Sequence, residues 1–345
     1  MRLTNLCCLI VIAAVTVACG QPKFKITETA GIDREFEPVP VEGQTLFVSV
    51  RAGESRTVSA AEAAPQDMLR VERTDPVGSV VENGVFVANL SKRVVREAEE
   101  DSGTLRALTY KPFDVTFLRT QNRMHWAPSF QRVGANGYSS IGTWHPVQEF
   151  THTQEAATYV LHRSGHHAAY PEVKMDATYT FYAQAPYFLF ESKMEIVAPI
   201  EMFWLRNQEM TMDAAFTHVA WPGSPEPRLV GLEERHAILE KEPIPPDTPW
   251  VCFLNLDKGY GYGAVNLHYV ATKTVNAHTS INDGANNGRY WDRHLISRTP
   301  TLLEPGERYE EKVAYVLFRA QRDNPLAEFL GWEKRLRNPL RVERQ

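Results

Sequence analysis

The stretch VKMDATYTF at residues 173–181 decides the fold class, because apolar residues stand at every second position along it. Side chains two positions apart share one face of an extended strand, so this alternation predicts a strand that turns one apolar face to a core. The same reasoning predicts further strands at Tyr187–Val197, Phe203–Leu205, Val251–Leu256, Gly263–Tyr269 and Lys312–Phe318. Helical periodicity is scarce. We therefore expect a mostly β protein with antiparallel sheets.

One short helix is expected near the C-terminus. Asn324-Pro325 provides a cap and a proline for the first turn, and Asn338-Pro339 ends the segment. Four apolar residues between these two dipeptides lie along one side of the predicted helix: Leu326, Phe329, Leu330 and Leu336.

The first part of the chain after residue 22 is predicted to be a small β unit of its own. Pro and Gly interrupt short extended segments there, and Leu46, Val48 and Val50 follow the period of two that a strand requires. A turn at Asp75-Pro76-Val77-Gly78 closes this segment. The sequence thus predicts a leading β unit at residues 23–80 and a large body at residues 81–345.

The N-terminus has the features of an export signal. Arg2 is followed by an apolar run from Leu6 to Val17, which is too short to span a bilayer comfortably. The sequence Thr16-Val17-Ala18-Cys19 resembles the lipobox at which bacterial lipoproteins are cleaved and lipidated. We expect a signal peptide at 1–18, a lipid anchor on Cys19 and a linker at 19–22. The protein would then lie in the cell envelope, periplasmic or at the outer membrane, or be secreted if no lipid is added.

Charge and cysteine usage exclude some classes. The formal net charge of −5 over 345 residues leaves no basic excess for a nucleic-acid backbone. Cys7 and Cys8 would leave with the signal and Cys19 would carry lipid, so Cys252 would be the only free thiol. No intramolecular disulfide is then possible, and stability must come from the hydrophobic core.

Residues 81–110 carry a resemblance to a known family. Val81–Leu90 is a predicted strand that opens with Glu82-Asn83, and a charged loop separates it from a second strand at Ser102–Tyr110 with the pattern Gly-x-Leu-x-x-Leu. This arrangement resembles the first hairpin of galactose-mutarotase-like β-supersandwich domains, which occur in mutarotases, many polysaccharide lyases and some glycoside hydrolases. The resemblance implies an antiparallel β-supersandwich that handles carbohydrate.

Three clusters of polar and aromatic residues are candidates for a carbohydrate site, because sugar rings stack on flat aromatics and bond to amides and guanidinium groups. The alternative is an irregular surface loop whose aromatic residues simply pack down. The first cluster, within 122–152, contains His125, Trp126, Gln131, Arg132, Tyr138, Trp144 and His145.

The second cluster follows an apolar strand and contains Arg206, Asn207, Glu209 and, further along, His218. An arginine at a strand end can hold a carboxylate with two hydrogen bonds. The alternatives are a structural salt bridge from Arg206 to Glu209 or Glu201 and a core position for His218.

The third cluster is a polar strand that follows an Asn- and Gly-rich loop. Tyr290, Asp292 and His294 share one of its faces, and Trp291 and Arg293 share the other. A strand this polar is costly to bury on both sides, so one face should line a cleft. An edge strand held by Asp292 and its arginine neighbours is the alternative.

Neither a metal nor a cofactor is expected. The run His162–His167 contains three histidines, but adjacent His166 and His167 point apart in a strand, and no acidic partner stands at a ligand spacing. A loop near the rim of the cleft is the favoured interpretation of this run.

The leading hypothesis is a polysaccharide lyase that cleaves a uronate-containing glycan by β-elimination. This reaction needs a group that neutralises the uronate carboxylate, a base for the C5 proton and an acid for the leaving oxygen. The neutralising candidates are Arg206, Asn207 and Arg293. The candidate bases are His125, His145 and His218. The candidate acids are Tyr290 and Tyr138.

Two other functions remain open. A glycoside hydrolase would use a pair of carboxylates, for which Glu149, Glu209, Asp283 and Asp292 are available without a diagnostic spacing. A surface lipoprotein that captures glycans without cleaving them would rely on exposed aromatics at Trp126, Trp144 and Trp291. The expected partners are a poly- or oligosaccharide and, through the lipid, a membrane.

Overall fold

The computed structural model describes residues 22–59, 69–91, 93–95, 98–100, 103–118, 125–126, 128–141, 148–212, 215–284 and 288–345. Over these residues the chain is mostly β, its sheets are antiparallel, and the prediction of the fold class is confirmed. The helices are α1 (Arg235–Leu239) and α2 (Ala327–Arg337), with a short 3-10 turn, η2, at Lys111–Phe113. Helix α2 lies where the sequence predicts it. No helix in the described part of the chain is long and apolar enough to cross a membrane.

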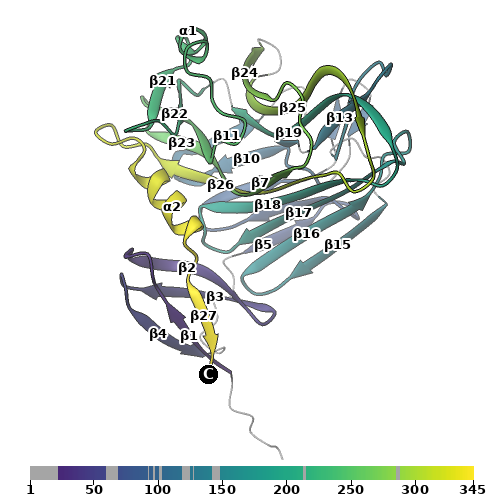
Figure 1. Ribbon diagram of the computed structural model, residues 1–345. Helices are drawn as coiled ribbons and strands as arrows, with labels where there is room; N and C mark the ends of the chain where they lie inside the picture. The colour runs from purple at the N-terminus through teal and green to yellow at the C-terminus, as the bar shows by residue number, and fades with distance from the viewer. Residues whose placement is uncertain are drawn as a thin grey trace, which may run out of the picture.

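A nine-stranded sheet forms the broad layer of the body (Figure 1). Its strands, in spatial order, are β15 (Glu149–Gln154), β16 (Thr158–Gly165), β17 (Val173–Tyr182), β18 (Tyr187–Ile196), β26 (Arg308–Arg319), β23 (Tyr260–Ala271), β22 (Trp250–Asn255), β20 (His218–Trp221) and β21 (Arg228–Gly231). The alternating stretch at residues 173–181 lies within β17. Met175, Tyr179 and Phe181 are at most 1% exposed on the inner face of this strand.

Two smaller sheets complete the body. The six-stranded sheet has the order β14 (Ser139–Ser140), β13 (Ser129–Arg132), β19 (Ile200–Met212), β25 (Gly288–Leu303) and β24 (His278–Gly284), and β12 (His125–Trp126) also pairs with β19. The five-stranded sheet has the order β11 (Val115–Leu118), β10 (Ala107–Tyr110), β7 (Phe86–Asn89), β6 (Ser79–Glu82) and β5 (Arg70–Arg73). A further hairpin joins β8 (Arg93–Val95) to β9 (Ala98–Glu100).

One hydrophobic core joins the three sheets. It contains Phe86 from the five-stranded sheet, Leu205 and Leu295 from the six-stranded sheet, and Tyr179 and Tyr315 from the nine-stranded sheet. Burial of apolar surface between layers is the main favourable term in folding, so this shared core fixes how the layers face each other. The outer face of the six-stranded sheet is left available for a site.

The leading β unit is shorter than predicted and includes the end of the chain. Strands β1 (Lys23–Thr27) and β4 (Ser55–Ser59) form a sheet with β27 (Arg341–Arg344), beside the hairpin of β2 (Arg34–Val41) and β3 (Gln44–Val50). A separate core, with Phe24, Ile26 and Leu340, fills this unit. Strands β5 and β6 belong to the body, so the predicted boundary at residue 80 is wrong. Their pairing with β7 and β10 outweighs their nearness in sequence to the leading unit.

The glycine-rich segment from Gly259 to Gly263 is the entry to β23. Gly259 has a φ of 77°, but Gly261 and Gly263 lie within the strand, where their missing side chains admit the rings of Phe318 and Phe329. A Cβ on Gly261 would stand 2.1 Å from the Phe318 ring.

Gly261→Ala should therefore lower the free energy of unfolding by about 1–3 kcal/mol, because a packed core accommodates an added methyl group only with strain. Gly331→Ala is the matched control, since a Cβ at this position of α2 would meet no atom within 4 Å. We expect this control to raise stability by about 0.5–1 kcal/mol. Urea unfolding followed by tryptophan fluorescence measures both. Equal values for the two variants would contradict the assigned packing.

Candidate functional site

A cavity of about 470 Å³ opens on the outer face of the six-stranded sheet. Three neighbouring strands of that sheet, β19, β25 and β24, supply most of its lining. The side chains that line it are Tyr138, Trp204, Arg206, His278, Ser280, Asn282, Tyr290, Asp292, His294, Ser297 and Arg298.

Strand register explains why these residues meet. Every second residue of β25 faces outward, so Tyr290, Asp292 and His294 form a row on the cavity side. The opposite residues of β24 face the same way, and the pairs are Asn282 with Tyr290, Ser280 with Asp292, and His278 with His294. On the other side of β25, Arg206 of β19 pairs with His294. Directly opposite residues have neighbouring side chains, so the sheet itself builds a compact polar cluster.

Asp292 is the fixed centre of the cluster. Its side chain is fully buried; Arg206 Nη1 lies 2.7 Å from Oδ2, and His294 Nε2 lies 2.9 Å from Oδ1. Ser280 also donates to Oδ1. Burial alone would raise the pKa of Asp292, but the hydrogen bond from His294 and the charges of His294 and Arg206 outweigh it and hold the pKa below its usual value. Asp292 is therefore an anion that orients Arg206 and His294.

A hydrogen bond shows which ring nitrogen of His278 carries the proton. Its Nδ1 lies 2.8 Å from the carbonyl oxygen of Asn276, and because a carbonyl only accepts, Nδ1 carries the proton. In the neutral ring Nε2 then holds a lone pair, which is the requirement for a general base. The ring of His278 stacks on His294 with centroids 4.4 Å apart and planes at 4°. His294 is in turn fixed by Asp292, so both rings have settled orientations.

An aromatic and cationic wall completes the cavity. Tyr138, which is 46% exposed, stacks with Trp204 at 6.4 Å between ring centroids. The guanidinium of Arg206 lies over the Tyr138 ring at 4.7 Å, and that of Arg298 lies over Trp204 at 5.6 Å. Arg298 is exposed and has a φ of 51°, in the left-handed region that a non-glycine residue rarely adopts. Residues held in this way concentrate at functional sites.

The structure brings three of the predicted site residues into this cavity: Tyr138, Arg206 and Tyr290. Tyr138 belongs to the first predicted cluster, Arg206 to the second and Tyr290 to the third, and in the structure all three line one cavity. The sequence predicts that one face of this strand lines a cleft, and it is the face with Tyr290, Asp292 and His294 that lines the cavity. The chemical roles of Tyr138, Arg206 and Tyr290 stay predictions.

Trp291, Arg293 and Asn207 lie on the opposite side of the sheet, and the prediction that they contact substrate is wrong. Each is at most 1% exposed. The Arg293 guanidinium lies 4.4 Å from the centroid of the Tyr269 ring, and its Nη2 donates to the carbonyl of Thr248 at 3.2 Å. These internal partners allow the sandwich to bury a charged residue that sequence reasoning assigns to a surface.

Three further predicted residues with described side chains, Gln131, Arg132 and His218, do not line this cavity. Gln131 donates to the carbonyl of Ala135, and Arg132 pairs with Glu172 at 2.8 Å. His218 lies on β20, in the nine-stranded sheet, with Nδ1 2.8 Å from Thr217 Oγ1. The side chains of His125, Trp126 and Glu209 are not described, although β12 pairs with β19 at Met210 and Glu209. Cys19, Trp144 and His145 lie outside the described residues.

Sequence reasoning missed several lining residues, of which His278, Trp204 and Arg298 are the most important. A period-two signal exists in β24, where His278, Ser280 and Asn282 alternate with Thr279 and Ile281, but it becomes informative only once the pairing of β24 with β25 is known. Among the described residues, no group of three or more His, Cys, Asp or Glu side chains is arranged to hold a metal ion.

Comparison with known proteins yields structural likeness alone. No family model matches the chain, and no curated protein matches its sequence. Among solved structures, a TPR-domain-containing protein from Parabacteroides distasonis aligns with a TM-score of 0.43 and 10% identity, over 89% of this chain and 56% of that one. An alpha-N-acetylgalactosaminidase from Bifidobacterium bifidum aligns at 0.40 and 12%, over 69% of this chain and 35% of that one.

A galactose mutarotase-like protein from Lactobacillus casei aligns with a TM-score of 0.41 and 8% identity, over 70% of this chain and all of that one. This chain therefore spans only about half and a third of the first two structures but the whole of the third. Likeness at this level decides neither family nor function.

Proposed function

We propose that the cavity on the six-stranded sheet cleaves a uronate-containing polysaccharide by β-elimination. The observation that carries the proposal is the state of His278, whose Nδ1 donates to a backbone carbonyl and whose Nε2 therefore keeps a lone pair in the neutral ring. Two arginines and two tyrosines line the same cavity. This combination supplies a base, a partner for a carboxylate and an acid.

The proposed step assigns each group. Arg298 pairs with the uronate carboxylate and stabilises the negative charge that develops as the C5 proton leaves. His278 Nε2 takes that proton, the C5–H electrons form a C4–C5 double bond, and the C4–O bond breaks. The departing oxygen receives a proton from the hydroxyl of Tyr138 or of Tyr290. Arg206 is tied to Asp292 and acts as a positioning residue, together with His294.

The carboxyl groups argue against hydrolysis. A glycosidase of the usual kind needs two carboxyl groups that flank the scissile bond. Among the described side chains, the cavity contains one carboxyl, Asp292, which is fully buried and already bonded to Arg206 and His294. Glu149 bonds to Ser164 on the edge of the nine-stranded sheet. The structure does not describe the side chains of Glu209 and Asp283.

Non-catalytic glycan capture is the second candidate. It is favoured by the Tyr138–Trp204 pair, because a partly exposed aromatic platform is what the apolar face of a sugar ring stacks on. Capture would need this platform but not the proton-transfer groups.

The N-terminal sequence supports a location outside the cytoplasm. The chain would be exported and anchored by lipid at Cys19, which would bring the cavity to polysaccharide in the cell envelope or beyond it. Metabolic labelling with a radioactive fatty acid in wild type and Cys19→Ser tests the anchor, and label that persists in the variant would refute it.

The activity test follows the ultraviolet absorbance of the new double bond while the purified unlipidated protein acts on a panel of uronate polysaccharides. Arg298→Ala should lower kcat/KM by about 10²–10³-fold, the usual loss when a preorganised partner of developing charge is removed. A substrate whose carboxylates are methyl-esterified is the matched control, since the variant should then lose little.

Reducing ends that appear without absorbance would instead support a hydrolase. Binding without either signal would support capture, and an equal loss on both substrates would remove Arg298 from its role.

A further inference from the structure

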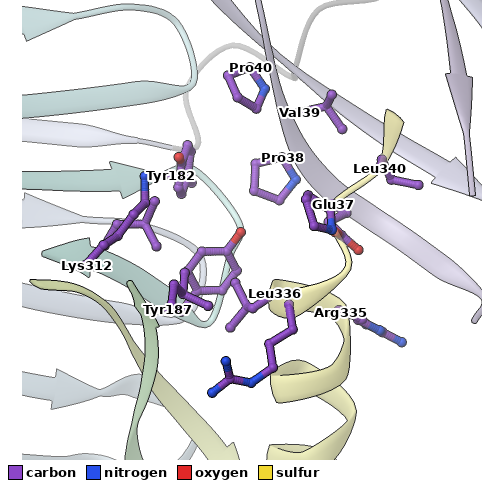
Figure 2. A pocket seen from close by; sticks show the side chains of 14 residues that line it. Glu37, Pro38, Val39, Pro40, Tyr182, Tyr187, Lys312, Arg335, Leu336 and Leu340 are labelled. Atoms are coloured by element: carbon purple, nitrogen blue, oxygen red, sulfur yellow. The ribbon is translucent and has the colours of Figure 1, made fainter. Parts of the chain in front are cut away.

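A second and larger cavity, of about 660 Å³, lies between the leading unit and the body. Its walls come from three places: β2 with Pro38 and Pro40, the outer face of the nine-stranded sheet with Tyr187, and the end of α2 with Leu336. Figure 2 shows the Tyr187 ring between Pro38 and Leu336. The candidate site on the six-stranded sheet shares no residue with this cavity.

The walls are mainly aliphatic. Apart from Tyr182 and Tyr187, the uncharged lining consists of Pro38, Val39, Pro40, Leu189, Leu267, Leu336, Pro339 and Leu340. Protein interiors normally pack without voids of this size, and cavities of about 300–1,000 Å³ with mostly apolar walls are typical of small-molecule sites. An aliphatic wall suits an alkyl body better than a sugar ring, which needs flat aromatics and hydrogen-bonding groups.

The charges on the lining favour an anion. The lining contains three cationic residues, Lys312, Arg335 and Arg337, and one carboxylate, Glu37. Both oxygens of Glu37 are held by Arg34, at 2.8 and 2.9 Å. The guanidinium of Arg34 compensates the charge of Glu37, which weakens the repulsion of an incoming anion.

The three cations differ in their other contacts. Lys312 also contacts Glu191 at 2.8 Å, and Arg337 also contacts Glu333, neither of which lines the cavity. The guanidinium of Arg335 stacks on Trp332 at 4.9 Å. Figure 2 shows Lys312 beside Tyr182 and Tyr187, and Arg335 on the other side of Tyr187 at the ribbon of α2.

We propose that this cavity binds an amphipathic organic carboxylate, with its alkyl body against the proline, leucine and tyrosine walls and its acid group on Lys312 or Arg335. Such a ligand would touch the leading unit, α2 and the nine-stranded sheet together. It would therefore stabilise the docking of the two parts, because a ligand that binds only the folded arrangement raises the unfolding temperature.

Titration calorimetry of the purified unlipidated protein with octanoate tests the proposal, with 1-octanol as the neutral match and hexanoate as the shorter acid. Octanoate should bind about tenfold more tightly than hexanoate, because two methylene groups fewer are buried in the shorter acid. It should also bind more tightly than 1-octanol and raise the unfolding temperature.

Leu267→Trp should fill the cavity and abolish octanoate binding, and Leu189→Trp provides a second filling variant should the first fail to fold. Leu302→Trp, at an exposed leucine of β25, is the control and should bind as wild type does. Lys312→Gln with Arg335→Gln should weaken octanoate but not 1-octanol.

No binding of octanoate, or equal binding in Leu267→Trp and wild type, would overturn the proposal. Equal affinity for octanoate and 1-octanol would overturn its anionic class. Binding of a uronate disaccharide instead of octanoate, lost in Leu267→Trp, would replace it with a second glycan site.

Discussion

His278→Ala should lower kcat by about 10²–10⁴-fold, the range that a general base contributes, while binding of the uronate polysaccharide falls little. This expectation rests on the Nε2 atom of His278. Nδ1 of His278 donates to the carbonyl of Asn276, so Nε2 is the atom that accepts a proton. In His294, the other histidine of the lining, Nε2 is held by Asp292 and Nδ1 is buried.

The control is His268→Ala. His268 is an exposed histidine of β23, with its side chain 55% exposed, and it lies outside the cavity, so the variant should keep wild-type kinetics. Added imidazole should restore part of the activity of His278→Ala but have no effect on the control. A His278→Ala variant with full turnover would move the base to a residue such as His125 or His145, whose side chains are not described.

Asp292→Asn separates positioning from proton transfer. Asp292 touches Arg206 and His294 rather than the open space, so its loss should disturb the orientation of both neighbours. The variant should lose kcat in a way that added imidazole does not restore, whereas imidazole should restore part of the activity of His278→Ala, because in that variant the missing group is the base itself. These different signatures distinguish a residue that acts through others from the one that takes the proton.

The sequence predicts which residues of β25 share a face, but it does not predict which residues of other strands lie beside them. Alternation places Tyr290, Asp292 and His294 on one face, because the period of a strand is a local property. Which face is buried depends on the layer packed against it. Inside the molecule, Arg293 contacts the ring of Tyr269 and the carbonyl of Thr248, which are distant in sequence. Arg293 and Trp291 are therefore buried, although the sequence predicts that they are exposed.

The proposed base, His278, could not be predicted from local sequence either. His278 is isolated in sequence and gains meaning only from its register opposite His294. The end of the chain is another example, since no local pattern indicates that β27 completes a sheet with β1. Local periodicity thus predicts elements and faces, and pairing between distant segments decides which faces meet.

Arg34→Ala should lower the free energy of unfolding by about 3–5 kcal/mol, the usual cost when one partner of a buried ion pair is removed. Arg34 is 2% exposed, and Nη1 binds both oxygens of Glu37 while Nη2 lies 3.1 Å from Glu28 Oε1. Its guanidinium also donates to two carbonyls at the end of α2, those of Arg335 at 3.3 Å and Asn338 at 2.6 Å. Removal of Arg34 leaves two carboxylates buried and uncouples the helix end from the leading unit.

The matched control is Arg344→Ala, in the same unit. Arg344 pairs with Glu42 at 2.8 Å, but the two side chains are 67% and 44% exposed, so we expect a loss of at most about 1 kcal/mol. Urea unfolding of both variants measures the difference, and equal losses would show that the buried network contributes nothing beyond a surface pair.

Acid should weaken the wild-type network through Glu28. Although burial alone would raise its pKa, the backbone N–H groups of Gly53 and Ala30, with Arg34, lower the pKa from 4.5 to about 2. A carboxyl whose folded pKa is depressed stabilises the fold above its unfolded pKa and loses that contribution as the pH falls. The stability of the wild type should therefore decline between pH 4.5 and about 2. Glu28→Gln should flatten this decline, and an unchanged slope would place the acid sensitivity elsewhere in the chain.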